Sequence, residues 1–204
     1  MIATEAAPTE VASWLADRLD EDDLPYAYGG ALALGAWGVP RTTTDVDVAV
    51  FVAESELDRL LDSIERAGAM VDRTAARRSV ATSGFLVAHL GRTRLDLFIA
   101  HHPWHADMHA RRQLLPTPDG KQRWFLSLED TALAKLLYAR PKDIQDLDRL
   151  FAVQRNRIDL AYVRRWLAAM VPVQDMRLRT LEEIAGRFVT RGETQPSTHP
   201  SFPI

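Results

Sequence analysis

Two aspartates one residue apart stand at the start of an apolar, strand-like run. Residues 45–52 read DVDVAVFV. Because side chains alternate between the two faces of a strand, Asp45 and Asp47 point the same way, about 7 Å apart along the chain. Two carboxylates this close repel each other unless a cation lies between them, and a hard divalent ion suits such oxygen ligands.

A third aspartate lies in a second strand-like run. Residues 93–99 read TRLDLFI, and Asp96 faces away from the flanking apolar side chains. If this strand pairs beside the first, three carboxylates converge and can hold two Mg²⁺ ions for in-line phosphoryl transfer. The spacing therefore predicts a metal site built from Asp45, Asp47 and Asp96.

A pair of glycines precedes these aspartates. Gly29 and Gly30 stand before a run of small residues, 31–37, that is typical of a short helix ended by Gly38 and Pro40. Glycine allows a close backbone approach, and N–H groups at a helix start bind phosphate. Either motif alone is common in turns and loops, but the two in this order favour a functional site for a phosphate-bearing ligand.

Hydrophobic periodicity predicts the elements that position these residues. We expect strands at residues 46–52, 84–90, 93–99 and 123–126. The second and third of these form a hairpin that turns at Gly91 and Arg92. We expect helices at residues 9–19, 31–37, 54–67, 128–139, 142–154, 160–170 and 175–189. Residues 101–120 are expected to be irregular or partly helical.

This order of elements predicts an α+β fold, with flanking helices on a mixed or mostly antiparallel sheet, followed by a helical C-terminal half. We expect a core over residues 1–126 and a helical region packed on it over 127–190. The segment 191–204 is rich in proline and polar residues, so we expect a disordered tail there.

Composition restricts the class of protein. The 204 residues include no cysteine, which excludes disulfides and thiolate metal sites. A net charge of −3 argues against a general nucleic-acid coat protein, and no apolar run is long enough to span a membrane. We therefore expect a soluble, cytoplasmic protein with no membrane partner. Residues 151–204 carry 8 basic and 5 acidic side chains, so this mildly basic end could meet a polyanion.

The segments YGGALALG, RTTTDVDVAV and LDLF together resemble the nucleotidyltransferase fold of the DNA polymerase β superfamily. The core motif of that superfamily is a Gly-Gly or Gly-Ser turn before a D-x-D strand. The later segment SLEDTALAKLLYARPKDIQDLDRL is similar to the downstream helix pair of the AbiEii-type nucleotidyltransferases, which include toxins of toxin–antitoxin systems. The resemblance covers residues 26–150.

The resemblance implies roles for the matched residues. Gly29 and Gly30 would cradle the triphosphate of an NTP substrate. Asp45 and Asp47 would ligate Mg²⁺, with two ions expected, and Asp96 would complete the site and help to activate the acceptor hydroxyl. Many relatives carry serine after the first glycine, so this chain lacks a hydroxyl that would contact phosphate.

Lys135 matches the lysine of the family's downstream helix, and the resemblance gives it a phosphate contact. Asp143 or Asp146 matches the acid that follows, and we predict Asp146 together with Lys135 as catalytic residues. The leucines around Lys135 predict that the aliphatic part of its side chain is buried and that its ammonium group points at a specific partner. The structural alternative is an ion pair with Asp143, Asp146 or Glu129.

Two further segments could border the site. Arg41 could approach a phosphate or a base, and we predict Arg41 and Thr44 as nucleotide contacts. Four histidines are clustered in the sequence: His101, His102, His105 and His109. Imidazoles bind zinc, but Pro103 interrupts a helix through His101 and no HExxH pattern is present. We expect instead a loop or short helix that caps the site, with Arg111 and Arg112 on its rim.

These patterns predict a metal-dependent nucleotidyltransferase that moves NMP from an NTP to an acceptor hydroxyl and releases pyrophosphate. The branch resemblance favours RNA, such as tRNA, as acceptor and implies a possible antitoxin protein as partner. A small-molecule transferase of the antibiotic-modifying type is the first alternative. A catalytically silent member that binds only a nucleotide or a partner chain is the second.

Overall fold

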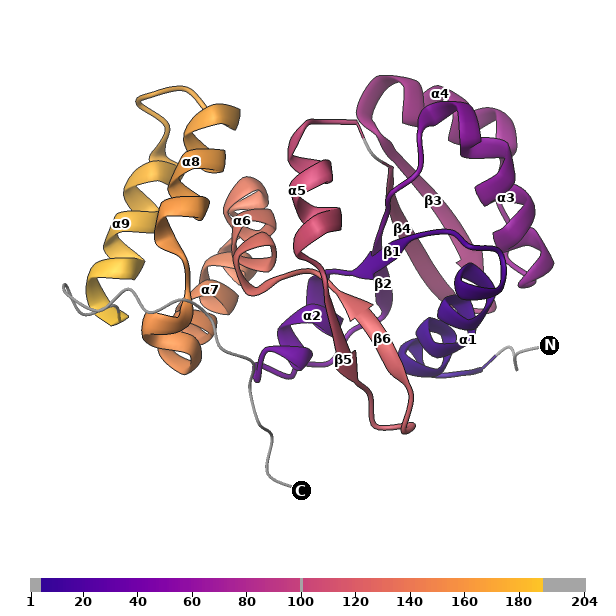
Figure 1. Cartoon of the computed structure of the whole chain (residues 1–204), viewed down its shortest axis with the longest axis horizontal. Helices are drawn as coiled ribbons and strands as arrows, with labels where there is room; N and C mark the ends of the chain where they lie inside the picture. The colour runs from indigo at the N-terminus through magenta and orange to yellow at the C-terminus, as the bar shows by residue number, and fades with distance from the viewer. Residues whose placement is uncertain (1–4, 100, 189–204) are drawn as a thin grey trace. The chain divides into compact units, whose positions relative to one another are not determined.

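The computed structural model describes residues 5–99 and 101–188, so the predicted tail lies outside the described residues. The described residues of 1–36 and 40–127 form one compact unit, and those of 37–39 and 128–204 form a second. The first unit contains a sheet with its helices, and the second is helical (Figure 1). The predicted α+β class is therefore confirmed. Within the described part of the chain, no helix is long and apolar enough to cross a membrane.

The sheet has six strands in the order β3-β4-β2-β1-β6-β5. It is mixed, because β2 pairs with β4 and β1 with β6 in parallel, whereas the other neighbours are antiparallel. The predicted β3–β4 hairpin is confirmed, and its turn includes Gly91 with φ +60°. The strands are β1 (Tyr26–Tyr28), β2 (Asp45–Val50), β3 (Phe85–Leu90), β4 (Thr93–Ile99), β5 (Gln113–Pro116) and β6 (Gln122–Phe125).

The alternation of side chains fixes which face of β2 and β4 carries the aspartates. Val46, Val48, Leu95 and Leu97 are fully buried on one face of these two strands. Burying one such side chain stabilises the fold by about 1.5–3 kcal/mol, and a register shift of one residue would expose the whole row. The polar residues between them are therefore held on the opposite face.

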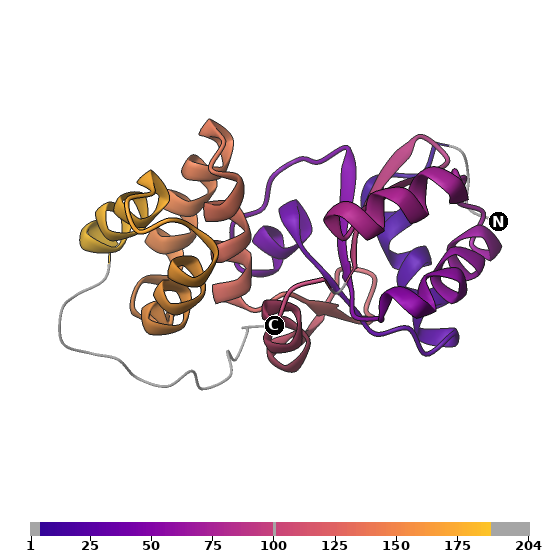
Figure 2. The ribbon, with the colours of Figure 1, turned by 90° about the horizontal axis from the view of Figure 1, so that it is seen from above.

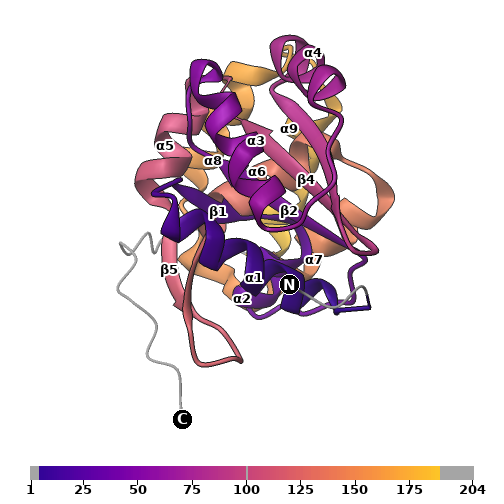
Figure 3. The same ribbon diagram turned by 90° about the vertical axis from the view of Figure 1, so that its right-hand side faces the viewer.

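Helices of the first unit pack on and beside this sheet. Helix α1 lies against α3 (Figure 3). Just after α3, the carbonyl oxygen of Ala67 accepts from Trp14 Nε1 at 3.0 Å. Helix α4 packs against β3 (Figure 1). The helices of this unit are α1 (Pro8–Glu21), α2 (Gly30–Ala36), the 3₁₀ turn η1 (Glu54–Glu56), α3 (Leu57–Arg66), α4 (Arg73–Ser83) and α5 (Trp104–Arg111).

The sequence analysis missed one helix, α4, and two strands, β5 and the three-residue β1. No element was predicted at residues 69–83, where α4 lies, because only Ala76 and Val80 of this helix are buried and its apolar periodicity is weak. The helix is nonetheless well delimited, since Asp72 caps its start and Gly84, with φ +65°, ends it. Strand β5 was also missed, because it is four residues long and lies at the edge of the sheet.

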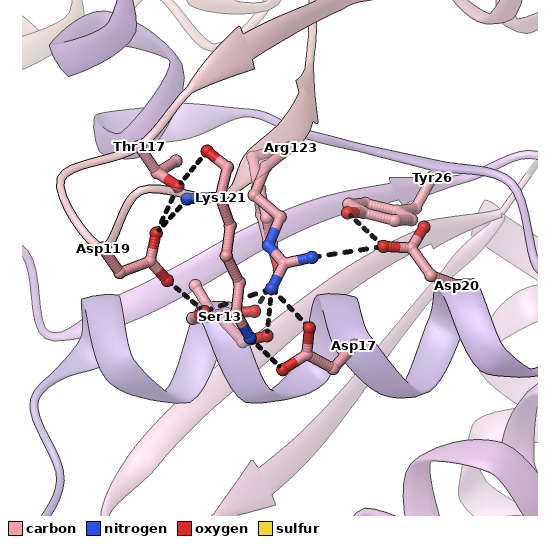
Figure 4. A network of polar contacts seen from close by, with 10 residues as sticks. Ser13, Asp17, Asp20, Tyr26, Thr117, Asp119, Lys121 and Arg123 are labelled. Atoms are coloured by element: carbon pink, nitrogen blue, oxygen red, sulfur yellow. Dashed lines mark hydrogen bonds and ion pairs between the residues drawn. The ribbon is translucent and has the colours of Figure 1, made fainter.

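A buried arginine joins β6 to α1 (Figure 4). The side chain of Arg123 donates to Asp17 Oδ1 at 2.5 Å, to Asp20 Oδ2 at 3.3 Å and to the carbonyl oxygen of Ser13 at 3.3 Å. Asp119, in the β5–β6 turn, accepts from the Ser13 hydroxyl at 2.6 Å. These bonds attach the β5–β6 hairpin to the first helix of the same unit.

The second unit is a group of helices that pack on one another (Figure 2). Pro141 occupies the first turn of α7, where its missing N–H costs nothing, and Asp143 accepts from the backbone N–H of Arg140 at 3.2 Å. Gln154 donates to the carbonyl oxygen of Trp37 at 2.6 Å. The helices are α6 (Leu128–Tyr138), α7 (Pro141–Gln154), the 3₁₀ turn η2 (Arg155–Arg157), α8 (Leu160–Met170) and α9 (Met176–Phe188).

Candidate functional site

The first unit places the three predicted aspartates on neighbouring strands. Asp47 of β2 lies directly opposite Asp96 of β4 in the parallel register, and Asp45 lies opposite Arg94. Paired residues of parallel strands point to the same side of a sheet, so all four side chains share one face. The three aspartates are only partly buried, whereas the residues between them face the core.

The carboxylates of Asp45 and Asp96 are held by neighbouring side chains of the same unit. Asp45 Oδ1 accepts from the Thr43 hydroxyl at 2.5 Å. Asp96 Oδ1 accepts from Arg94 Nε at 2.6 Å. As placed, no three acidic or histidine side chains within the described ranges lie close enough to hold one metal ion. The oxygen donors have the chemistry that Mg²⁺ prefers, but two of them are engaged by groups of the protein.

Gly30 brings the backbone directly onto Asp47. Its φ is +52°, which favours glycine, and a Cβ at this position would lie 1.7 Å from Asp47 Oδ2. Gly29 is less constrained, because an added Cβ would come no closer than 3.4 Å to Leu126. The backbone N–H of Gly29 donates to the carbonyl oxygen of Asp47 at 2.9 Å. Of the two glycines, Gly30 is therefore the one that the arrangement requires.

Arg94 concentrates positive charge at this face. The hydrogen bond to Asp96 and the charge of that carboxylate raise the pKa of Arg94, and the more distant charges of Asp45 and Asp47 add to the increase. The guanidinium therefore lies within electrostatic reach of all three aspartates. Sequence analysis missed this residue, although a spacing of two along a strand already places Arg94 on the face of Asp96.

The loop before β2 contributes a threonine that bonds one of the aspartates. Thr44 is exposed, and it is the hydroxyl of Thr43 that bonds the Asp45 carboxylate. Arg41 is partly buried and donates to the carbonyl oxygen of Thr42 at 3.3 Å. The predicted nucleotide contacts of Arg41 and Thr44 stay predictions.

Lys135 belongs to the second unit and lies in a buried ion-pair cluster. Its side chain is 7% exposed, and Nζ donates to Asp143 Oδ1 at 3.1 Å and to Asp146 Oδ2 at 2.9 Å. Arg140 Nε donates to Asp143 Oδ2 at 2.6 Å. Burial tends to raise the pKa of Asp143, but hydrogen bonds from Arg140 and Lys135 outweigh it, so that the pKa lies below its usual value. This is the ion pair that sequence analysis named as the structural alternative.

The histidine cluster surrounds an open cavity of about 450 Å³ in the first unit. Helix α5 begins only at Trp104, so His101 and His105 do not share a helix face. His102 Nδ1 accepts from the backbone N–H of Trp104 at 3.1 Å. The cavity is lined by Phe51, His101, His102, Pro103, His105, Ala106 and His109. Among the residues that the structure describes, no three of these histidines lie close enough together to bind one metal ion.

The predicted rim residue Arg112 packs on aromatic rings near this cavity. Its guanidinium lies 4.3 Å from the centre of the Trp124 ring and 5.8 Å from that of Phe51. Phe51 in turn stacks on His109, with the ring centres 4.9 Å apart. Burial lowers the pKa of Arg112. These contacts hold α5 and the end of β2 together, and the predicted capping role of this segment stays a prediction.

The sequence identifies the class of protein to which this arrangement belongs. Residues 20–185 match a family described as nucleotidyltransferase of unknown function (DUF6036). The chain belongs to this nucleotidyltransferase family. The narrower AbiEii-type assignment made from the sequence rests on the resemblance alone. No curated protein has a sequence that matches this chain.

Solved structures share the fold. The solution structure of the antibiotic-resistance factor ANT(2″)-Ia is 17% identical, with a TM-score of 0.53 over 90% of this chain and 92% of that one. A crystal structure of ANT(2″)-Ia in complex with adenylyl-2″-tobramycin is 18% identical, with a TM-score of 0.52 over 88% of this chain and 97% of that one. At these identities the likeness establishes the nucleotidyltransferase-like fold.

Proposed function

We propose that this protein transfers a nucleoside monophosphate from an NTP to an acceptor hydroxyl, with Asp45, Asp47 and Asp96 as the metal-binding residues. The observation that carries the proposal is the direct pairing of Asp47 with Asp96 on adjacent parallel strands, next to the side-chain-free backbone of Gly30. Membership in a nucleotidyltransferase family supports the same reaction class.

The donor set fits a divalent cation of the Mg²⁺ type. Three carboxylates on one face supply hard oxygen ligands, and their mutual repulsion is relieved by a bound cation. A bound Mg²⁺ would act as a Lewis acid on the phosphoryl oxygens and lower the pKa of the attacking hydroxyl. Two ions are expected from the sequence resemblance.

The chain's own groups have separate tasks in this proposal. Gly30 keeps the backbone against the Asp47 carboxylate, and Gly29 and Gly30 cradle the triphosphate beside it. Asp96 accepts the proton of the acceptor hydroxyl while the hydroxyl oxygen forms a bond to the α-phosphorus. The bond between the α-phosphorus and the bridging oxygen breaks, and pyrophosphate leaves with its electrons. Arg41 and Thr44 contribute contacts to the nucleotide.

Lys135 and Asp146 are proposed catalytic residues that already bond each other in the structure. A phosphate role for Lys135 must coexist with its two bonds to Asp143 and Asp146, which occupy a buried ammonium group. The burial favours the structural role, in which the pair fixes α6 against α7. The two roles predict different effects on stability when Lys135 is replaced, because only the structural role requires the ion pairs for folding.

The acceptor is proposed from the charges of the second unit. Arg164 forms two 2.7 Å bonds to Glu182, Arg177 pairs with Asp175 at 2.7 Å, and Arg187 pairs with Asp148. These three arginines are paired with carboxylates of the same unit, which lowers the net positive charge that the unit offers to a polyanion. This observation favours a small hydroxyl compound as acceptor, and the solved structure with adenylyl-2″-tobramycin shows this class on the same fold.

RNA is the second candidate acceptor. The sequence similarity of residues 127–150 to AbiEii-type enzymes supports it, and an antitoxin protein would then be a partner. The test is incubation with each α-³²P-labelled NTP, Mg²⁺ and either total RNA or a panel of aminoglycosides and other polyols. Label in a small compound supports the first candidate, and label in RNA supports the second. No transfer with any NTP or acceptor would indicate a catalytically silent member.

A further inference from the structure

Arg94 supports an inference that rests on the proposed metal site. It lies on β4 directly opposite Asp45 and two residues before Asp96, on the face that carries the three aspartates. Its side chain is 50% exposed, whereas that of Asp96 is 15% exposed. A long, half-exposed arginine that reaches over a more buried carboxylate can move away without leaving a cavity in the core.

The Arg94 guanidinium places a positive charge on the face that carries the three aspartates. Its Nε bonds Asp96 Oδ1 at 2.6 Å, and its position on β4 lies directly opposite Asp45 on β2. An arginine does not lose its proton in a protein, so its positive charge is permanent. A divalent cation on Asp96 and this guanidinium on Asp96 would therefore repel each other at close range.

We propose that Arg94 is a built-in counter-cation that competes with the divalent ion for Asp96, and that the displaced guanidinium then binds the triphosphate of the nucleotide. In the metal-free protein the arginine limits the repulsion among the three carboxylates. Once an ion occupies the carboxylates, the anionic triphosphate is the nearest partner for the released guanidinium, and arginine binds phosphate through paired N–H donors. Arg94 thus lowers metal affinity but raises nucleotide affinity.

The test compares Arg94→Gln with the wild type and with Arg92→Gln. Arg92 is a matched control, because it lies on the same hairpin, is 78% exposed and pairs with Glu5 at 3.8 Å. Mn²⁺ binding is measured by electron paramagnetic resonance, and thermal unfolding is followed with EDTA and with Mg²⁺. Nucleotide binding is measured with a fluorescent, non-hydrolysable NTP analogue at saturating Mg²⁺. Asp47→Asn reports whether the metal site exists.

We expect Arg94→Gln to bind Mn²⁺ roughly threefold more tightly than the wild type, the size of effect typical of a partly exposed ion pair. The variant should be less stable than the wild type in EDTA and should gain more in melting temperature from Mg²⁺. Its affinity for the nucleotide analogue should fall, whereas Arg92→Gln should match the wild type in every measurement.

Two results would overturn the inference, and they have different meanings. If Asp47→Asn loses Mn²⁺ while Arg94→Gln binds it no more tightly than the wild type, Arg94 does not compete and only the present inference fails. If Asp47→Asn and the wild type bind Mn²⁺ equally, the metal site itself fails, and the proposed function fails with it.

Discussion

The contact between Gly30 and the Asp47 carboxylate couples the two motifs that the sequence presents separately. Gly30 has φ +52°, and a Cβ atom added to it would lie 1.7 Å from the Asp47 carboxylate. Any other residue at this position would therefore displace Asp47. Asp47 is the aspartate paired with Asp96 across the two strands. The geometry of the aspartates and the conformation of the glycine turn therefore depend on each other.

Gly30→Ala should destabilise the protein by about 1–2 kcal/mol from the left-handed backbone alone, and further through the clash with Asp47. Gly29→Ala is the matched control, because its added methyl group meets only ordinary contacts. Urea unfolding of both variants measures the difference. Equal free energies of unfolding for the two variants would contradict the assigned role of Gly30.

Lys135→Met should lower the free energy of unfolding by about 3–5 kcal/mol, because it removes the buried cation that bonds both Asp143 and Asp146. Lys142→Met is the control, since Lys142 is exposed on α7. Unfolding free energy and nucleotide affinity are measured on the same preparations. A loss of nucleotide affinity with unchanged stability would instead support the predicted phosphate role.

Sequence reasoning found part of this residue-scale picture. The D-x-D spacing and the paired glycines identified Asp45, Asp47, Asp96 and Gly30, because backbone alternation alone decides where such residues point. It did not find the Thr43–Asp45 and Arg94–Asp96 bonds. The partners of each bond are two residues apart, so spacing places them on one face, but whether their side chains bond depends on rotamers that spacing does not determine.

At the scale of elements, strand register and helix pairing hold the candidate residues. The parallel β2–β4 pair sets Asp47 opposite Asp96, and its register is fixed by the buried row on the other face. These strands were predictable, since both alternate strongly. Helix α4 and strand β5 were not, because α4 buries little apolar surface and β5 is short.

The α6–α7 pair should lose stability in acid. The pKa of Asp143 is lowered, so its carboxylate contributes stability above the unfolded pKa of about 3.9 and loses it as pH falls through the lower folded pKa. Unfolding free energies measured by urea titration between about pH 6 and pH 2.5 should therefore decline, and Asp143→Asn should show a shallower decline. An identical pH dependence in the variant would contradict this role of Asp143.

At the scale of the whole molecule, the described chain combines a mixed-sheet unit that carries the aspartates with a helical unit that carries the Lys135 cluster. The family assignment covers parts of both, since it extends from residue 20 to residue 185. Membership in a nucleotidyltransferase family supports the reaction class, but the acceptor depends on contacts that the family assignment does not describe. The acceptor was therefore not predictable from the glycine and aspartate motifs, whose proposed roles concern the nucleotide and the metal.

The central claim is that the paired aspartates support nucleotidyl transfer. The most direct measurement is Mg²⁺-dependent transfer of label from an α-³²P NTP by the wild type and by Asp47→Asn, with folding checked by circular dichroism. We predict a loss of roughly a hundredfold or more in rate, the scale of removing one key electrostatic group, with stability equal to or slightly above that of the wild type because repulsion is relieved. Transfer at the wild-type rate by a folded Asp47→Asn variant would contradict the claim.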